Sequence, residues 1–405
     1  MRPLELAATV QAFEQALAAA DLADDNPRRS GNTQREENTD VTERLIIDSH
    51  LDLGWNAMSW KRDITLEVDA INRAEAQLSD SPARGHATTS LPEMRRAGIA
   101  VCFATLLARS PTGRTARYEA GDLDFRTQDM AYGSARGQLA YYRALERRGE
   151  LRAIATTSEL DAHWAAWQDS ADAARLPIGF VLAFEGSDGI VDPSSVAEWH
   201  AEGLRCASLV HYGANPYAVG TGEDGPLTAR GRELLAAFER AGVILDVTHL
   251  SDTSFFAALD VFGGPVLASH NNCRALVPHQ RQFSDEQLRR LLDRDAVIGI
   301  ACDSWMLSPG YERGVTPRDC VSIDALADHI DRICELAGDA AHVAIGSDLD
   351  GGFGHEQTPV GLETIADLRK LEGILAARGY VARDIERVFS GNWLGFLRRH
   401  LPQTR

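Results

Sequence analysis

Histidine and acidic side chains fall at the ends of several apolar, strand-like runs of this sequence. The first run, LIIDSHLD, contributes His50 and Asp52. The later runs end near single polar residues, namely Glu185, His211, His249, His270 and Asp348. Imidazole nitrogens and carboxylate oxygens are the ligands that Zn²⁺ and similar ions take in proteins. Buried carboxylates that meet in one pocket are costly unless a cation neutralises them, so the pattern predicts a metal site.

Independent structural roles explain this set poorly. A single histidine at a strand end is usually a hydrogen-bonded structural residue, and an isolated HxD triplet is common. Here, however, carboxylates follow the first, third and eighth strand-like runs, and histidines follow the fourth, fifth and sixth. His50 and Asp52 also share one face of their strand, because side chains alternate with a period of two. We therefore predict that the set forms one pocket with acid–base groups beside the metal ligands.

Strand-like and helix-like segments alternate along the chain after Arg44. The β-branched runs are LIIDSHLD, IAVCFATLL, IGFVLAFEG, CASLVHYG, VILDVTHLS, PVLASHNN, AVIGIACDS and HVAIGSDLDGG. Between them, apolar spacing predicts helices at 230–241, 285–293, 323–337 and 364–378. Eight such units predict an α/β fold, a (β/α)₈ TIM barrel with parallel strands. In such barrels the functional groups lie at the carboxyl ends of the strands, which is where the polar residues fall.

The rival architecture is a doubly wound open sheet. That fold normally carries a glycine-rich phosphate loop after its first strand, where this chain has His50, Leu51 and Asp52. The barrel is therefore favoured.

Two segments lie outside the regular alternation. The interval 108–177, between the second and third strands, is too long for a simple connection and predicts an insertion with an extra helix at 131–148. At the N-terminus, residues 4–22 have the spacing of an amphipathic helix, and residues 24–42 have the composition of a polar linker. We therefore expect an N-terminal helix and linker, 1–43, ahead of one metal-dependent (β/α)₈ domain, 44–405.

Charge and hydropathy exclude several classes of partner. The 405 residues include 41 basic and 59 acidic ones, for a net charge of −18, which would repel nucleic acid phosphates. The longest apolar run, 98–108, is far shorter than the roughly 20 residues that a membrane helix needs, so we expect no membrane partner. No export sequence is visible, and a cytoplasmic location is expected.

The strand-end motifs, in this order and spacing, resemble those of the renal or membrane dipeptidases, a branch of the amidohydrolase superfamily of metal-dependent barrels. The match includes DSHLD, AFEGSD, LVHYGANPY, DVTHLS, ASHNN, HQRQ, GSDLDGG and GNWLGFL. Most of the superfamily has HxH on the first strand and often a carboxylated lysine as a bridge. Here Asp52 replaces the second histidine and no lysine lies at a strand end, which points to the dipeptidase branch.

The resemblance implies a cofactor of two Zn²⁺ ions per chain. His50 and Asp52 would bind the first ion, and His249 and His270 the second. Glu185 and a hydroxide would bridge the two ions. Such a pair can share a hydroxide, acidify it and polarise the amide carbonyl that it attacks.

The resemblance also implies roles for three further residues. His211 would lie beside the scissile carbonyl and stabilise the oxyanion, and Asp348 would shuttle the proton. Arg281, in HQRQ, would contact the substrate's carboxylate. These residues form the predicted substrate-binding set, and His211 and Asp348 are its catalytic members.

The sequence departs from the family at the seventh strand. The mammalian enzymes have an aromatic, NFY-like segment there, whose tyrosine helps hold the substrate carboxylate, and this chain has ACDSWM. Asp303 or Trp305 occupies that neighbourhood. Asp350 could also face inward, but Gly351 and Gly352 predict a tight loop, so Asp348 is preferred. The remaining histidines are expected at the surface, namely His86, His163, His200, His279, His329, His342, His355 and His400.

We therefore predict a binuclear zinc dipeptidase whose partner is a small dipeptide, with a D-residue accepted at the C-terminal side. The first alternative is hydrolysis of an N-acyl amino acid, a lactone or a β-lactam at the same site, because pocket loops set the substrate. The second is a non-catalytic barrel that keeps the metals and binds a small ligand. Such a binder would need neither Asp348 nor His211. A homodimer is left open.

Overall fold

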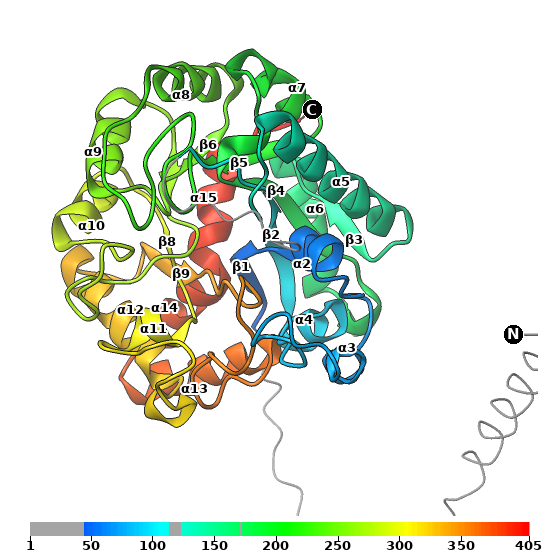
Figure 1. The fold of residues 1–405 in the computed structure, drawn as a ribbon. Helices are drawn as coiled ribbons and strands as arrows, with labels where there is room; N and C mark the ends of the chain where they lie inside the picture. The colour runs from blue at the N-terminus through cyan, green and yellow to red at the C-terminus, as the bar shows by residue number, and fades with distance from the viewer. Residues whose placement is uncertain (1–43, 113–122, 171, 405) are drawn as a thin grey trace, which may run out of the picture. The chain divides into compact units, whose positions relative to one another are not determined.

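The computed structural model describes residues 44–112, 123–170 and 172–404, and the expected N-terminal helix and linker lie outside these ranges. Eight parallel strands surround one apolar interior (Figure 1). They are β1 (Ile46–Leu51), β2 (Ile99–Leu107), β4 (Ile178–Glu185), β5 (Leu204–Ser208), β6 (Ile244–Asp246), β7 (Val266–Leu267), β8 (Ile298–Ile300) and β9 (Val343–Ile345). The predicted (β/α)₈ barrel is confirmed, with each predicted strand in its expected place.

The strands pair in two sets that join into a closed barrel. Strands β1, β2, β4, β5, β6 and β7 pair in that order, and β8 pairs with β9. A bridge between Ala268 and Ile298 connects β7 to β8. Side chains close the last seam: the Asp48 carboxylate accepts hydrogen bonds from the backbone N–H and hydroxyl of Ser347, at 2.9 and 2.5 Å. The barrel is thus held by backbone ladders on one side and partly by side chains on the other.

Helices surround the strands (Figure 1). They are α2 (Leu53–Ser59), α3 (Val68–Glu75), α4 (Leu91–Ala97), α5 (Gln128–Arg147), α6 (Thr157–Gln168), α7 (Val196–Ala201), α8 (Ala229–Ala241), α9 (Asp252–Val261), α10 (Asp285–Leu292), α11 (Ser304–Leu307), α12 (Asp324–Ala337), α13 (Lys370–Ala377), α14 (Ala382–Glu386) and α15 (Asn392–His400). All the helices predicted after residue 44 are present. The one predicted at 364–378 begins as a 3-10 turn, Ile365–Arg369, which runs directly into α13.

The predicted insertion between the second and third barrel strands is confirmed. It contains α5, which begins three residues earlier than expected because the Thr127 side chain caps it by accepting from the Met130 N–H. It also contains a short strand that sequence reasoning missed, β3 (Leu151–Ala153). This strand pairs with the first residues of β4, and β5 pairs with the last ones. Because β2 occupies the other edge of β4, strands β3 and β5 share one edge.

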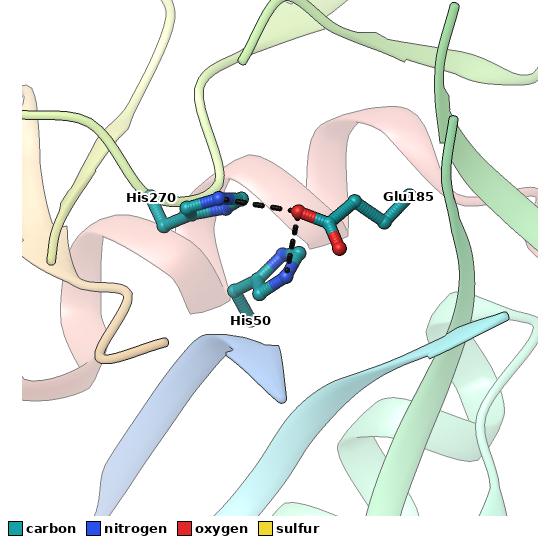
Figure 2. A group of neighbouring side chains, drawn as sticks. All are labelled: His50, Glu185 and His270. Carbon is teal, nitrogen blue, oxygen red and sulfur yellow. Dashed lines mark ion pairs between the residues drawn. The ribbon is translucent and has the colours of Figure 1, made fainter. Parts of the chain in front are cut away.

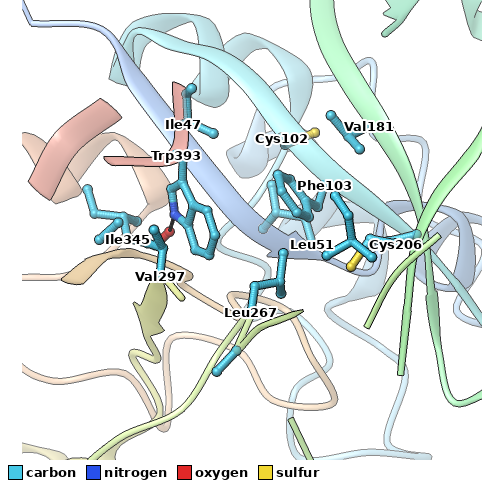
Figure 3. Close-up of a cluster of buried hydrophobic side chains, with 14 of the residues drawn as sticks. Ile47, Leu51, Cys102, Phe103, Val181, Cys206, Leu267, Val297, Ile345 and Trp393 are labelled. Carbon is cyan, nitrogen blue, oxygen red and sulfur yellow. Dashed lines mark hydrogen bonds between the residues drawn. The ribbon is translucent and has the colours of Figure 1, made fainter. Parts of the chain in front are cut away.

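Apolar side chains from both ends of the chain fill the barrel. Trp393 of α15 lies among Ile47, Phe103, Leu267 and Ile345, which come from four different strands (Figure 3). Its indole N–H donates to the carbonyl of Ile345 at 2.9 Å, so the one polar atom of this large side chain is satisfied inside the core. The C-terminal helix is therefore part of the barrel's interior packing.

Two histidines expected at the surface are buried instead. His163 of α6 is 1% exposed, and its ring lies 2.9 Å from the carbonyl of Ala100. His329 of α12 is fully buried and accepts a hydrogen bond from the Cys273 N–H at 3.0 Å. Each ring finds a backbone partner, which compensates for its removal from water.

Among the helices that the structure describes, none has the length and apolar character needed to cross a bilayer.

Candidate metal centre

The predicted ligands meet at the carboxyl ends of the barrel strands. His50 is the second-last residue of β1, and Glu185 ends β4. The remaining residues follow their strands within three positions, namely Asp52, His211, His249, His270 and Asp348. Parallel strands bring these ends to one rim of the barrel. The ligand side chains are almost fully buried, with no more than 4% of any of the predicted five exposed.

Glu185 is the centre of the cluster. Its Oε1 atom lies 3.1 Å from Nε2 of His249, and 3.4 Å from Nε2 of both His50 and His270. Nε2 of His211 lies 3.6 Å away. Figure 2 shows the His50 and His270 rings both turned toward one oxygen of this carboxylate. One carboxylate within reach of four imidazoles from different strands is in the position expected for a bridging ligand.

The side chains fall into three overlapping groups, each compact enough to hold a metal ion. They are His50 with Glu185 and His270, Glu185 with His211 and His249, and His50 with Asp52 and Asp348. Nε2 of His50 is buried without a hydrogen-bond partner in the described protein. Nε2 of His249 lies 3.0 Å from Nε2 of His270. Nitrogen and carboxylate oxygen donors in this arrangement fit divalent cations such as zinc.

Hydroxyl groups behind the ring nitrogens fix which nitrogen faces the centre. The Ser269 hydroxyl donates its proton to Asp246 at 2.5 Å and can therefore only accept from the rings beside it. Nδ1 of His50 lies 3.2 Å from this oxygen, and Nδ1 of His270 lies 2.9 Å from it. In both rings Nδ1 is thus the donor to Ser269, and Nε2 is the nitrogen that faces the centre and is available to a metal ion.

A second hydroxyl holds His249. Its Nδ1 lies 2.9 Å from Oγ1 of Thr221, and its backbone has a left-handed φ of 69°. Sequence reasoning missed Thr221, Ser269 and Asp246. For Asp246 a signal was present, because this residue ends the strand-like run VILD three positions before His249.

The buried charges show why this site needs cations. Burial and the negative charge of Glu185 raise the pKa of Asp52 to about 7. Burial also raises the pKa of Asp348 well above its usual value, with Glu185 and Asp52 adding to the effect. Although burial lowers the pKa of His50, the carboxylates of Glu185 and Asp52 outweigh it and raise that pKa to about 10. The protein alone therefore resists holding all three carboxylates ionised, and positive metal charge would relieve this.

His211 differs from the other histidines of the cluster. Burial, aided by the positive charges of Arg109 and Arg281, lowers the pKa of its imidazole to about 3 despite the opposing carboxylate of Glu185. The ring is therefore neutral at ordinary pH, and it lies at the wall of the cavity that adjoins the ligands.

That cavity has a volume of about 700 Å³. Its wall includes Asp52, Trp55, Leu107, Arg109, Leu123, Glu185, His211, Tyr212, His249, Arg281, Asp303, Trp305, Met306, Arg313, Asp348, Gly351 and Gly352. The guanidinium of Arg281 is buried and donates to the carbonyl of His270 at 2.8 Å and to the Asn271 side chain, both neutral acceptors. Its positive charge is thus presented to the cavity without being neutralised by these partners.

Asp303 and Trp305 both line the cavity, as the departure from the family pattern led us to expect. The Asp303 carboxylate is already engaged, because it accepts from Arg313 and from Gln357, each at 2.7 Å. This carboxylate and Arg313 thus form one neutral pair, and Arg281, whose hydrogen bonds go to neutral acceptors, is the better source of positive charge for an anionic ligand.

Asp348 and Asp350 point to different places. Asp348 lines the cavity, and its Oδ1 lies 3.9 Å from Nε2 of His50. The carboxylate of Asp350 instead accepts from the backbone N–H groups of Thr88 and Thr89, at 2.9 and 3.1 Å. Both aspartates have left-handed φ values, 57° and 64°, which produce the tight turn predicted from the glycines that follow. Of the two aspartates, Asp348 is therefore the one that lines the cavity.

A barrel with histidine and carboxylate ligands at the carboxyl ends of its strands has the architecture of metal-dependent hydrolases. The sequence profile of one such family, "Membrane dipeptidase (Peptidase family M19)", matches residues 35–400, and the chain belongs to this family.

Individual relatives support the same grouping. "Dipeptidase aclJ" of Aspergillus oryzae is 33% identical over 225 residues, which cover 54% of this chain and 51% of that protein. "Dipeptidase tcpJ" of Claviceps purpurea is 29% identical over 223 residues, covering 54% and 50%. The chain thus spans about half the length of these curated relatives.

Solved structures share the fold. A metallopeptidase structure described as dipeptidase AC has a TM-score of 0.68 at 23% identity, covering 89% of this chain and 99% of that one. A metallopeptidase from Rhodobacter sphaeroides, crystallised with a phosphinate mimic of the dipeptide L-Ala-D-Ala, has a TM-score of 0.68 at 22% identity, covering 88% and 99%.

The hydrogen bonds between the Ser269 hydroxyl and the two ligand rings can be tested by substitution. Ser269→Ala removes the acceptor for two ligand rings, so we expect the affinity for Zn²⁺ to fall by about 10- to 100-fold, measured by competition with a chelator. Ser251→Ala is the matched control. That buried serine caps α9 through the Ser254 N–H, so its loss should lower stability and leave zinc affinity unchanged. Equal zinc affinities in the two variants would contradict the orienting role of Ser269.

Proposed function

We propose that the protein is a dipeptidase that works with two zinc ions. One observation carries the proposal: three of the predicted ligands, His50, His249 and His270, lie within 3.4 Å of the Glu185 carboxylate. This cluster adjoins a cavity of about 700 Å³ that also presents the uncompensated charge of Arg281. Such a cavity accommodates a small ligand, and its fixed positive charge favours one with a carboxylate. Membership of the dipeptidase family supports the same reading.

The residues divide into metal ligands and groups that act on the substrate. His50 and Asp52 would hold one ion, His249 and His270 the other, and Glu185 both. When bound, the two zinc ions would acidify a water molecule and polarise the carbonyl of the peptide bond. Two zinc ions would bring four positive charges, and the ligand set offsets only two of them, through its two carboxylates, because its three imidazoles are neutral when they bind metal. The remaining positive charge would stabilise the developing oxyanion.

Three further side chains bind the substrate, stabilise the oxyanion and transfer the proton. Arg281 binds the terminal carboxylate of the dipeptide and so fixes its direction in the cavity. His211 donates a hydrogen bond to the carbonyl oxygen as negative charge develops there. Asp348 accepts the proton of the attacking water and returns it to the nitrogen of the departing amine, which completes cleavage of the C–N bond.

We also propose that a D-residue is accepted at the C-terminal side of the substrate. The Rhodobacter sphaeroides relative was crystallised with a mimic of such a dipeptide, L-Ala-D-Ala. A matched pair of substrates, L-Ala-L-Ala and L-Ala-D-Ala, tests the point directly. Turnover restricted to the first would refute it.

The metal requirement is the main test of the function. The purified protein should contain about two zinc equivalents per chain, and a chelator should abolish dipeptide hydrolysis in a way that added Zn²⁺ reverses. Activity with only trace metal would contradict the proposal. Turnover of N-acyl amino acids, lactones or β-lactams in place of dipeptides would favour another hydrolase, and no turnover of any of them would favour a binding protein.

The proton transfer is tested by Asp348→Asn. Asparagine has nearly the same shape but cannot take the proton, so kcat should fall by about 10²- to 10⁴-fold while both zinc ions are retained. Asp350→Asn is the control, because that carboxylate is engaged with Thr88, Thr89 and Arg62. Asp350→Asn should lower the free energy of unfolding and change kcat little. The reverse pattern would assign the proton to Asp350, and loss of a zinc ion from Asp348→Asn would make Asp348 a ligand.

Recognition of the carboxylate is tested by comparing free and C-terminally amidated dipeptides. The wild type should show a KM on the order of 10- to 100-fold higher for the amide, since a hydrogen-bonded charge pair contributes about 1.5–3 kcal/mol. Arg281→Met should abolish this difference. Arg313→Met, another cavity arginine but one paired with Asp303, should keep it. A wild type that does not distinguish the two substrates would remove this role from Arg281.

A further inference from the structure

His211 is held differently from the other three histidines of the cluster. In His50, His249 and His270 the Nδ1 atom faces a hydroxyl oxygen. Nδ1 of His211 instead lies 3.3 Å from Nη1 of Arg109. A guanidinium offers only N–H donors and stays protonated in proteins. Nδ1 of His211 must therefore accept this hydrogen bond, and the proton of the ring lies on Nε2.

This opposite tautomer separates His211 from the metal ligands. A ring nitrogen that carries a proton has no lone pair for a metal ion, although Nε2 of His211 lies within metal-binding reach of Glu185 and His249. The same N–H is suited to donate to an oxygen atom that gains negative charge. The hydrogen-bond partners on Nδ1 thus leave Nε2 of His50 and His270 to the metals and give Nε2 of His211 a proton for a different task.

Arg109 is itself held firmly. Its Nε donates to Oδ1 of Asp124 at 2.5 Å, and the Asp124 side chain is fully buried. Backbone hydrogen bonds join the same two segments, from the Arg109 N–H to Leu123 and from the Phe125 N–H back to Arg109, at 2.9 and 2.7 Å. The guanidinium therefore has little freedom to leave the imidazole.

The far side of the His211 ring is also packed. Tyr212 lies edge-on to it, with ring centroids 4.7 Å apart, and His249 lies edge-on at 4.3 Å. These contacts restrict the tilt of the ring, and the Arg109 bond restricts its rotation about the Cβ–Cγ bond. A group positioned in this way loses little freedom when the reaction begins.

We propose that Arg109 is a positioning residue, which together with Asp124 holds His211 with its proton on Nε2 and aims that proton at the carbonyl oxygen of the substrate. The aim at the substrate rests on the proposed dipeptidase function. The tautomer and its dependence on Arg109 are properties of the protein without substrate.

Kinetics test whether Arg109 acts through His211. Arg109→Met should lower kcat by about 10- to 100-fold with little change in KM and with both zinc ions retained, because a misplaced catalytic donor costs about that much. In a His211→Ala background the same change should cost nothing further. Arg109→Lys, which keeps a donor, should recover part of the loss. A wild-type kcat in Arg109→Met, or losses that add in the double variant, would overturn the proposal.

A control and a spectroscopic measurement complete the test. Arg95→Met removes another half-buried arginine, one that binds Glu150 and the Leu176 carbonyl. This variant should have the same kcat and KM as the wild type. In the zinc-loaded full chain labelled with ¹⁵N-histidine, the His211 resonances, assigned by their loss in His211→Ala, should show a proton on Nε2. Their unprotonated Nδ1 signal should shift in Arg109→Met.

The spectra also separate the two proposals. A proton on Nδ1 of His211, a metal-bound pattern, or an unchanged spectrum in Arg109→Met would overturn the role of Arg109 whatever the enzyme hydrolyses. If the wild type cleaves no dipeptide while the spectra behave as expected, the dipeptidase function fails and the assignment of His211 stands.

Discussion

The carboxylate of Glu185, buried at the mouth of the barrel within 3.6 Å of four imidazole nitrogens, is the constraint on which the rest of the site depends. Removing a carboxylate from water costs several kcal/mol unless a positive charge lies beside it. Beside burial, the charge of Glu185 raises the pKa of both Asp52 and Asp348, and Asp52 adds to the effect on Asp348. The arrangement is favourable only when cations share the space, so the ligand cluster and its metal ions must be considered as one electrostatic unit.

Around this centre, the partners of the outer ring nitrogens decide what each histidine can do. A hydroxyl that has already given its proton away, as Ser269 has to Asp246, leaves the inner nitrogen of His50 and His270 free for a metal. A guanidinium on the outer nitrogen, as on His211, leaves a proton on the inner one. Distances alone do not separate these roles, because all four rings lie about equally close to Glu185. The separation comes from which partner can donate and which can only accept.

Sequence reasoning identified the strands, the helices and the residues that cluster at the candidate metal centre because each has a strong local pattern. Buried parallel strands are apolar runs, and a ligand at the end of such a run interrupts its apolar character. The supporting residues have no such signal: Ser269 and Thr221 are ordinary polar residues in loops. Ser269 precedes His270 in the sequence, but only the folded chain brings it to His50, and brings Thr221 to His249. The strand β3 was missed because three residues that alternate between buried and exposed are too short to form a pattern.

Buried histidines were also misjudged for a physical reason. His163 and His329 lie on helices whose sequence patterns mark a buried face only approximately, and a neutral imidazole is tolerated there once it has a single hydrogen-bond partner. Their partners are backbone groups of Ala100 and Cys273, distant in sequence. No motif records such a contact, so composition and spacing could not separate these rings from surface ones.

The short strands on one side of the barrel, β7, β8 and β9, connect the barrel's closure directly to the residues of the metal centre. Strands β7, β8 and β9 are only two or three residues long, and the Ser269 carbonyl enters the space between them, where it accepts from the Ser49 hydroxyl at 2.5 Å. A Cβ atom on Gly299 or Gly346 would lie 2.0 or 1.8 Å from this carbonyl, so both positions require glycine. The same serine that orients two metal ligands through its hydroxyl thus closes the barrel through its carbonyl. Substitutions at the two glycines would therefore disturb the ligands even though neither glycine faces the cavity.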